Sequence, residues 1–380
     1  MKHEHSVLLE KRKLAPMEAL VSLYGEGDTE TARAIVASLS HRIFHHDPPA
    51  PSGAVRRGLA HFALWLMRKT TRAQRQIGPD GAPMVTYRNA ILEGADHPYA
   101  ITLLEPSRAD TSSFVEGGDP MNAVYMMLVP EIRRNANLWD SIMLDSVQAR
   151  DVQWRLVWET RMTHELAARR LKDGRPVRLK AAAAGTGLSM ILVLNRLLEE
   201  GHNPDLIAAT IGDREEANVR KAVRLMEKLP SLKPLLATEP GARGIFAGVE
   251  DLLAPWSPGP LPASDVVTLV GILEYFHGHT ATTTEELSGE AAPEGAVEAA
   301  ALVRAIGQLT APDGSLVVNT YRLGAAAQIL ETFGKKFRYR GRPEMEQLLA
   351  HGGFTPDNRF TSGNIFDVEV FRKADLNGSR

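Results

Sequence analysis

Apolar residues recur every three or four positions through much of the first 170 residues, with polar or basic residues between them. This is the period of an amphipathic helix, and it predicts helices over residues 16–23, 29–44 and 55–76. The first opens on a proline, which suits a helix N-terminus, and the helical period returns at 121–170. Residues 77–120 are rich in Gly, Pro, Asp and Ser and are predicted to be mainly loop. We expect this stretch to be either a lid or substrate-facing cap, or a plain interdomain connector.

From residue 176 the pattern changes, and short apolar runs alternate with helical segments. Nearly continuous apolar runs such as DVVTLVG are typical of strands buried on both faces of a sheet. The alternation predicts a doubly wound, Rossmann-like α/β sheet that binds ligands at the carboxyl ends of its strands. An opening strand is predicted to begin at 176, and later strands are predicted at 206–211, 244–252, 265–271 and 315–321. Helices are predicted at 188–198, 215–229, 296–309 and 343–350. An antiparallel hairpin is predicted at 358–373.

The stretch PVRLKAAAAGTG at 176–187 runs from the opening strand into a helix. A turn of small residues at this place presents backbone N–H groups to a nucleotide-like ligand, although such turns also serve close packing alone. Asp213 follows the second predicted strand, where a carboxylate holds ribose hydroxyls in nucleotide-binding α/β folds. The alternative for Asp213 is a cap for the helix at 215–229.

Composition narrows the class of protein. A chain of 380 residues, 44% hydrophobic, is long enough for two domains, which we place at 1–145 (helical cap or substrate domain) and 146–380 (α/β domain). The 44 basic and 46 acidic residues leave no charge excess that favours nucleic acid or an anionic membrane. The absence of cysteine excludes disulfides, thiolate metal sites and cysteine nucleophiles. No signal peptide or membrane span is visible, so we expect a cytoplasmic protein.

Two clusters of basic residues are interpreted as structural. His41, His45 and His46 include an i, i+4 pair that would suit a metal, but no nearby acid completes an HExxH-like set. We therefore expect surface or capping histidines and no metal. The Arg and Lys run at 68–75 lacks interleaved aromatic residues and is interpreted as a solvated helix surface.

In order along residues 150–373, the motifs resemble the class I S-adenosylmethionine-dependent methyltransferases. AAAAGTG at 181–187 is similar to the glycine-rich first motif of that family, and IGDREEANVRKA at 211–222 to its second-strand acid and helix. GVEDL at 248–252 resembles the acidic turn near the adenine. DVVTLVGILEYF at 265–276 resembles the fourth-strand motif, and LTAPDGSLVVNTY with RPEMEQLLAHGGF resembles the closing segment.

The resemblance implies S-adenosylmethionine as cofactor and a small-molecule acceptor, and it allows a homodimer. The balanced charge and the lack of a long apolar stretch lead us to expect no nucleic-acid or membrane partner. Aromatic faces suit a positively charged sulfur, which makes Tyr125, Tyr275 and Phe276 candidates beside the reacting methyl group, and His277 or Glu274 is a candidate base. The alternative for Tyr275 and Phe276 is a position in the core, and the alternative for His277 is an ordinary turn histidine. Arg150 is either a partner of the ligand carboxylate or an ordinary exposed arginine. The cofactor-binding residues that the resemblance implies are Ala183, Gly185, Thr186, Gly187, Asp213, Arg214, Glu250, Asp251, Leu252 and Gly271, with Arg150.

The chain departs from the family at the first motif. Ala181 and Ala183 stand where the family usually has an acid and its first glycine, so the carboxylate that fixes the amino group of the methionine moiety is missing there. Some relatives, such as nicotianamine synthases and azetidine-2-carboxylate synthases, use the aminocarboxypropyl arm and release methylthioadenosine, and a free amino group would suit such a cyclisation. A third hypothesis is a non-catalytic scaffold that binds the cofactor or has lost it.

Overall fold

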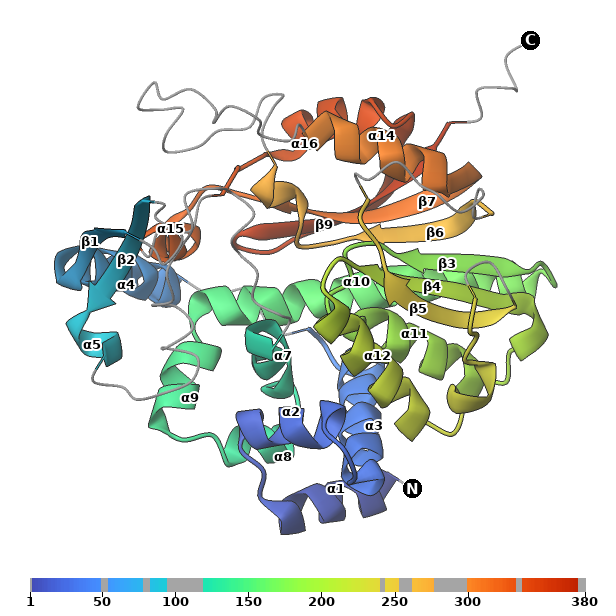
Figure 1. Cartoon of the computed structure of the whole chain (residues 1–380), viewed down its shortest axis with the longest axis horizontal. Coiled ribbons are helices and arrows are strands. Elements are labelled where there is room, and N and C mark those ends of the chain that lie inside the picture. The colour runs from blue at the N-terminus through green and yellow to red at the C-terminus, as the bar shows by residue number, and fades with distance from the viewer. Residues whose placement is uncertain are drawn as a thin grey trace.

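The computed structural model describes residues 2–48, 54–77, 83–93, 119–239, 243–252, 262–276, 299–332 and 337–374. Its centre is a seven-stranded sheet in the order β5-β4-β3-β6-β7-β9-β8 (Figure 1). Strands β3 to β7 run parallel, whereas β9 is antiparallel to both of its neighbours. This confirms the doubly wound α/β fold and the closing hairpin. The strands are β3 (Val177–Ala181), β4 (Ile207–Asp213), β5 (Gly244–Val249), β6 (Ser264–Leu269), β7 (Thr310–Tyr321), β8 (Phe354–Ser362) and β9 (Phe366–Lys373).

Helices cover both faces of the sheet (Figure 1). Alternate residues of β3, Val177 and Leu179 among them, belong to a core that includes α10 (Val147–Lys172) and α11 (Leu188–Glu199). On β6, Val267 and Leu269 belong to a second core with α14 (Ala299–Leu309) and α16 (Arg342–Ala350). The period of two along each strand therefore separates the two helical layers. The remaining elements around the sheet are α12 (Glu216–Lys228), α15 (Ala325–Glu331), η1 (Pro204–Leu206), η2 (Lys233–Leu235) and η3 (Leu273–Tyr275).

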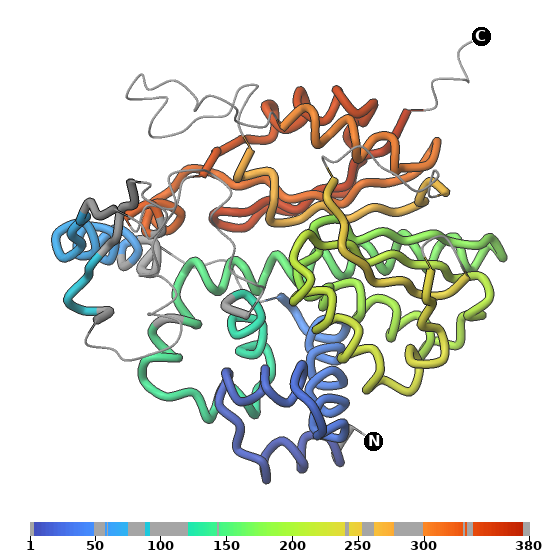
Figure 2. Tube along the Cα trace, viewed as in Figure 1, coloured from blue at the N-terminus to red at the C-terminus, as the bar shows by residue number. Residues whose placement is uncertain are grey.

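The N-terminal part of the chain is mainly helical. The helices predicted at 16–23 and 29–44 are confirmed as α2 (Pro16–Tyr24) and α3 (Thr29–His45). Figure 2 shows the blue N-terminal helices and the red C-terminal strands on opposite sides of α10. The other elements of this part are α1 (Lys2–Arg12), α4 (Ala54–Thr70), β1 (Thr71–Ile77), β2 (Pro83–Asn89), α5 (Ala90–Glu93), α7 (Asp119–Met126), α8 (Pro130–Arg134) and α9 (Leu138–Leu144).

The helix predicted over 55–76 is wrong in its last turns. It ends at Thr70, and the chain continues as β1, which pairs antiparallel with β2 from Thr71 opposite Asn89. The side-chain amide of Asn89 donates to the hydroxyls of both Thr70 and Thr71, at 2.9 Å each, and so fixes the change from helix to strand. This partner lies almost twenty residues further along the chain, which is why helical periodicity alone missed it.

The N-terminal helices are joined to the layer under the sheet. The ammonium group of Lys228 on α12 donates to the carbonyl oxygens of Ser22, Leu23 and Gly25 at the end of α2, at 2.8, 3.3 and 2.6 Å. These carbonyls are the acceptors that a helix end leaves unsatisfied. One apolar core continues from α1, α2 and α3 to the sheet. Within the described residues, no helix is long and apolar enough to cross a membrane.

Candidate functional site

The turn between β3 and α11 is tied to both neighbouring strands. The Ala182 amide donates to Thr268 on β6 at 3.0 Å, and the Ala184 amide donates to Gly212 on β4 at 2.9 Å. Ala183 has a φ of 50°, so alanine here occupies the left-handed region that favours glycine. Ala183 thus has a backbone conformation that is more usual for glycine.

Gly185 and Gly187 serve different purposes in this turn. Both have positive φ, 56° and 66°. A Cβ on Gly187 would lie 2.7 Å from the Ile211 side chain, so this glycine permits close packing of α11 on β4. A Cβ on Gly185 would meet nothing within 4 Å, which leaves the backbone of Gly185 open on that side. No side chain caps the N-terminus of α11, because its N-cap residue is Gly187.

Asp213 joins the turn to the next helix. One carboxylate oxygen accepts a hydrogen bond from the Gly185 amide at 2.7 Å. The other accepts from the Glu215 amide at 2.9 Å and from the Asn218 side chain at 3.0 Å. The structure therefore brings Gly185 and Asp213 together, and Asp213 also supports the start of α12. The adjacent Arg214 lies on the surface beside Glu215, at 3.6 Å.

Glu250, in the acidic turn after β5, is paired with Lys180, which was not among the predicted site residues. The ammonium group of Lys180 on β3 lies 2.7 and 2.8 Å from the two carboxylate oxygens, and both side chains are buried. Gly212 lies between them on β4, and a Cβ there would overlap the Glu250 carboxylate. The available sequence signal was a lysine two residues after Arg178 in the strand β3, whose other residues are apolar. Asp251 is exposed, and Leu252 packs against the core on the α14 side.

The carboxyl end of β6 carries the remaining predicted residues. Gly271 has a φ of 77°, and its amide donates to the side-chain oxygen of Asn319 at 2.6 Å. The short helix η3 follows and buries Glu274, whereas Tyr275 is only partly buried and contacts Phe337, with ring centroids 5.6 Å apart. His277 lies outside the described residues.

Arg155 on α10 reaches this end of the sheet and was not predicted. Its guanidinium lies 4.0 Å from Glu274, 3.5 Å from the Tyr125 hydroxyl and 4.6 Å from the centre of the Phe366 ring. A Cβ on Gly271 would lie 3.3 Å from both terminal nitrogens. Burial raises the pKa of Glu274, although Arg155 acts to lower it. Burial likewise raises the pKa of Tyr125.

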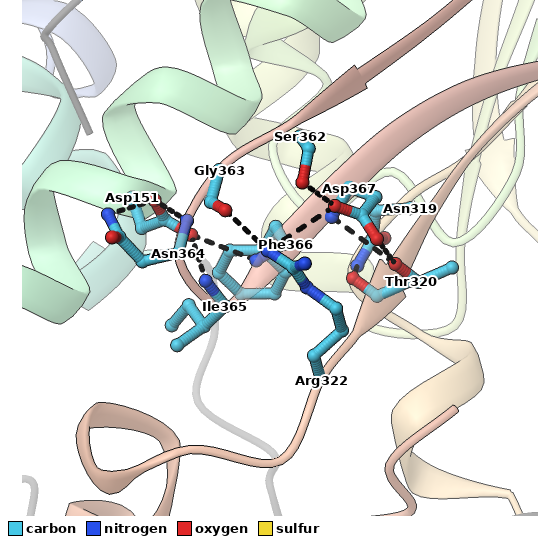
Figure 3. Close-up of polar contacts among 10 residues, drawn as sticks. All are labelled: Asp151, Asn319, Thr320, Arg322, Ser362, Gly363, Asn364, Ile365, Phe366 and Asp367. Carbon is cyan, nitrogen blue, oxygen red and sulfur yellow. Dashed lines mark hydrogen bonds and ion pairs between the residues drawn. The ribbon is translucent and has the colours of Figure 1, made fainter. Parts of the chain in front are cut away.

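Asp151, one helical turn before Arg155, fixes the tight connection between β8 and β9 (Figure 3). Its carboxylate accepts from the amides of Asn364, Ile365 and Phe366 at 2.8, 2.7 and 2.9 Å. Because the Phe366 ring lies under the Arg155 guanidinium, this connection helps to place that side chain. The available sequence signal was the four-residue spacing of Asp151, Arg155 and Glu159, which puts three charged residues on one face of α10.

The N-terminal helices contact the turn directly. The Thr186 hydroxyl lies 3.1 Å from the hydroxyl of Tyr24 and accepts from the side-chain amide of Asn122 at 3.0 Å. Asn122 and Tyr125 are three residues apart on α7, so they lie on one helix face. Helix α7 therefore spans the distance between the turn and Arg155.

Two further predictions concern residues away from this cluster. Arg150 donates twice to Asp145, at 2.8 and 3.0 Å, near the start of α10. His41 and His46 lie with ring nitrogens 3.3 Å apart. Across the described part of the chain, no group of three or more metal-binding side chains could hold an ion.

No protein-family model matches the chain, and no curated protein matches it. Among solved structures, it is similar to the CMeT domain of the citrinin polyketide synthase, at 13% identity over 95% of this chain and 98% of that chain, with a TM-score of 0.46. The chain is also similar to the CurJ carbon methyltransferase, at 13% identity over 95% of this chain and 100% of that chain, with a TM-score of 0.43. A third similar structure is the Burkholderia thailandensis 1,6-didemethyltoxoflavin-N1-methyltransferase, solved with S-adenosylhomocysteine. The identity is 18% over 57% of this chain and 79% of that chain, with a TM-score of 0.35.

The strand order is that of the methyltransferase fold. The mixed sheet has seven strands among the described residues, β9 runs opposite to the other six, and helices precede the sheet in the chain. The glycine-rich turn, Asp213, Glu250 and Gly271 lie at the carboxyl ends of β3, β4, β5 and β6, and Arg155 on α10 lies beside Gly271.

Proposed function

We propose that the protein is an S-adenosylmethionine-dependent methyltransferase that acts on a small molecule. The observation that carries the proposal is the contact between Asp213 and the Gly185 amide, which unites the glycine-rich turn and the second-strand acid at one edge of the sheet. Ligands of open α/β sheets bind at this edge. The ordered motifs and the strand order support the same function.

The residues at the edge fit the chemistry of such a cofactor. The turn Ala183–Gly187 and the positive end of α11 would border the methionine part of the cofactor, and Asp213 would lie near the ribose hydroxyls. Asp251 and Leu252 would border the adenine. Ala183 keeps a left-handed backbone at the place where the family has glycine, which fits a turn retained for ligand binding.

When bound, S-adenosylmethionine supplies a methyl carbon activated by a positively charged sulfur, open to in-line displacement. The chain contributes mainly by positioning, which is worth roughly 7–11 kcal/mol in favourable intramolecular cases. Tyr24 on α2 and Asn122 on α7 contact Thr186 of the turn, so these helices would shield the cofactor from water. Tyr125 and Tyr275 would offer aromatic faces near the sulfur. A proton on the acceptor would pass to His277 or Glu274.

Product identification tests the proposal. The purified protein is incubated with S-adenosylmethionine, alone and with a metabolite extract, and the nucleoside formed is identified by mass spectrometry. We expect S-adenosylhomocysteine that depends on the extract. Methylthioadenosine formed without a second substrate would instead establish use of the aminocarboxypropyl arm, and no product together with no cofactor binding would establish the scaffold hypothesis.

A matched pair of variants ties the activity to this edge. Asp213→Ala removes the carboxylate at the carboxyl end of β4, whereas Asp205→Ala removes an exposed carboxylate near the amino end of the same strand. We expect cofactor turnover to fall only in Asp213→Ala. Equal loss in both variants would show that the effect does not depend on the proposed site.

A further inference from the structure

Arg155 and Glu274 form a buried pair of opposite charges whose groups do not close on each other. Their side chains are only 8% and 5% exposed, yet the nearest nitrogen and oxygen are 4.0 Å apart. The buried pair of Lys180 and Glu250, in contrast, closes to 2.7 Å. One polar atom of each residue, Nε of Arg155 and Oε2 of Glu274, is buried without a hydrogen-bond partner.

Such an arrangement is costly unless something completes it. Removing two charges from water costs several kcal/mol per ion, and only close, fully hydrogen-bonded geometry offsets that cost. Buried polar atoms in native proteins nearly always have partners. The Arg155 guanidinium contacts the Phe366 ring and the Tyr125 hydroxyl, and it occupies the space beside Gly271. Moving it closer to Glu274 would weaken these contacts. The open pair therefore has the character of a binding site for a ligand with both charges.

The pair lies beside the proposed cofactor site. Gly271 follows β6, and β6 is hydrogen-bonded to the start of the glycine-rich turn through Thr268 and Ala182. Helix α7 contacts the turn through Asn122 and Arg155 through Tyr125, one helical turn apart. A ligand held at the turn is thus within a short distance of Arg155.

The other acids at this edge are already engaged. Asp213 accepts three hydrogen bonds from protein groups, and Glu250 is paired with Lys180. Glu159, one turn after Arg155, is hydrogen-bonded to Ser189. Ala181 cannot bind an amino group with its side chain. Of these four acids, Glu274 is the one with a buried carboxylate oxygen that lacks a hydrogen-bond partner.

We propose that Arg155 and Glu274 together bind the α-amino acid end of S-adenosylmethionine, Arg155 the carboxylate and Glu274 the ammonium group. This assignment rests on the proposed function. It supplies a clamp for the amino group that the alanines of the first motif cannot provide. It also removes Glu274 from the candidates for the general base. With its amino group held by a carboxylate, the cofactor is disposed to methyl transfer rather than to cyclisation through a free amine.

Ligand analogues test the assignment on the unaltered protein. Isothermal titration compares S-adenosylhomocysteine with methylthioadenosine, which lacks the amino acid end, and with the decarboxylated and deaminated analogues of S-adenosylhomocysteine. We expect each missing charge to weaken binding by about 10- to 100-fold, the range for a charge-assisted hydrogen bond. Equal affinity for S-adenosylhomocysteine and methylthioadenosine would overturn the inference and leave nucleoside binding intact. Failure of every nucleoside to bind would instead overturn the proposed function.

Variants then assign the effect to the two residues. In Arg155→Lys and Glu274→Gln, which preserve much of the side-chain volume, we expect S-adenosylhomocysteine to bind about tenfold more weakly while methylthioadenosine is unchanged. Arg169→Met is the matched control, because Arg169 lies on the same helix in an exposed pair with Glu165. Unchanged S-adenosylhomocysteine affinity in both site variants, or equal loss for both ligands, would show that other residues bind the amino acid end.

Discussion

Gly212 is predicted to be essential for stability because it allows a buried ion pair to cross β4. Glu250 and Lys180 meet on one face of the sheet at 2.7 Å, and a Cβ on Gly212 would overlap the Glu250 carboxylate. In Gly212→Ala the carboxylate must move, and the Lys180 ammonium group then loses its two short contacts with Glu250. Breaking a buried pair in this way costs about 3–5 kcal/mol.

The free energy of unfolding, from urea titrations followed by circular dichroism, measures this cost. Gly324→Ala is the control, because a Cβ there meets nothing within 4 Å, and we expect it to be close to neutral. Gly212→Ala should also be much less costly when Lys180 and Glu250 are both replaced by methionine, since no pair remains to be broken. A loss below about 1 kcal/mol, or the same loss in both backgrounds, would refute the reasoning.

Three further changes give separate expectations. Asp213→Ala should raise the cofactor dissociation constant about tenfold or more, on the order of 1.4 kcal/mol, and an unchanged constant by titration would remove Asp213 from the site. Lys228→Met should lower the free energy of unfolding by about 2 kcal/mol and expose α2 to proteolysis, because three carbonyl oxygens lose their hydrogen-bond donor. An unaltered rate of cleavage in α2 would contradict this expectation. Burial acts to raise the pKa of Asp357, but hydrogen bonds from Arg359 and Arg372 outweigh it and lower that pKa. The contribution of Asp357 to stability is therefore present above its unfolded pKa of about 4 and is lost as the pH falls below that value. Asp357→Asn should be destabilising at pH 7 and progressively less so below about pH 4, and a constant difference in the free energy of unfolding across that range would contradict the assignment.

The sheet was predictable from sequence because its strands are short apolar runs separated by turn residues. Asp213 was placed correctly at the end of β4, and its contact with Gly185 follows from the fact that neighbouring parallel strands end at one edge. The prediction of a hairpin at 358–373 likewise agreed with β8 and β9, although β8 begins earlier, at Phe354.

Features that depend on distant partners were missed. β1 is polar and gains its partner only from β2, so helical periodicity was extended through it. The short helix α15, with its alanines, gave too brief a pattern to be recognised. Asp151 and Arg155 lie four residues apart on α10, a spacing that fixes a shared helix face but does not say that the face meets β9 and the end of β6.

The crystal structure of the protein with S-adenosylhomocysteine would test the central claim most directly. We expect the nucleoside at the carboxyl ends of β3, β4 and β6, with its ribose beside Asp213, its carboxylate at Arg155 and its ammonium group at Glu274. A complex in which the nucleoside is bound elsewhere on the protein, with the edge beside Gly185 and Gly271 left vacant, would contradict the assignment of this edge as the cofactor site.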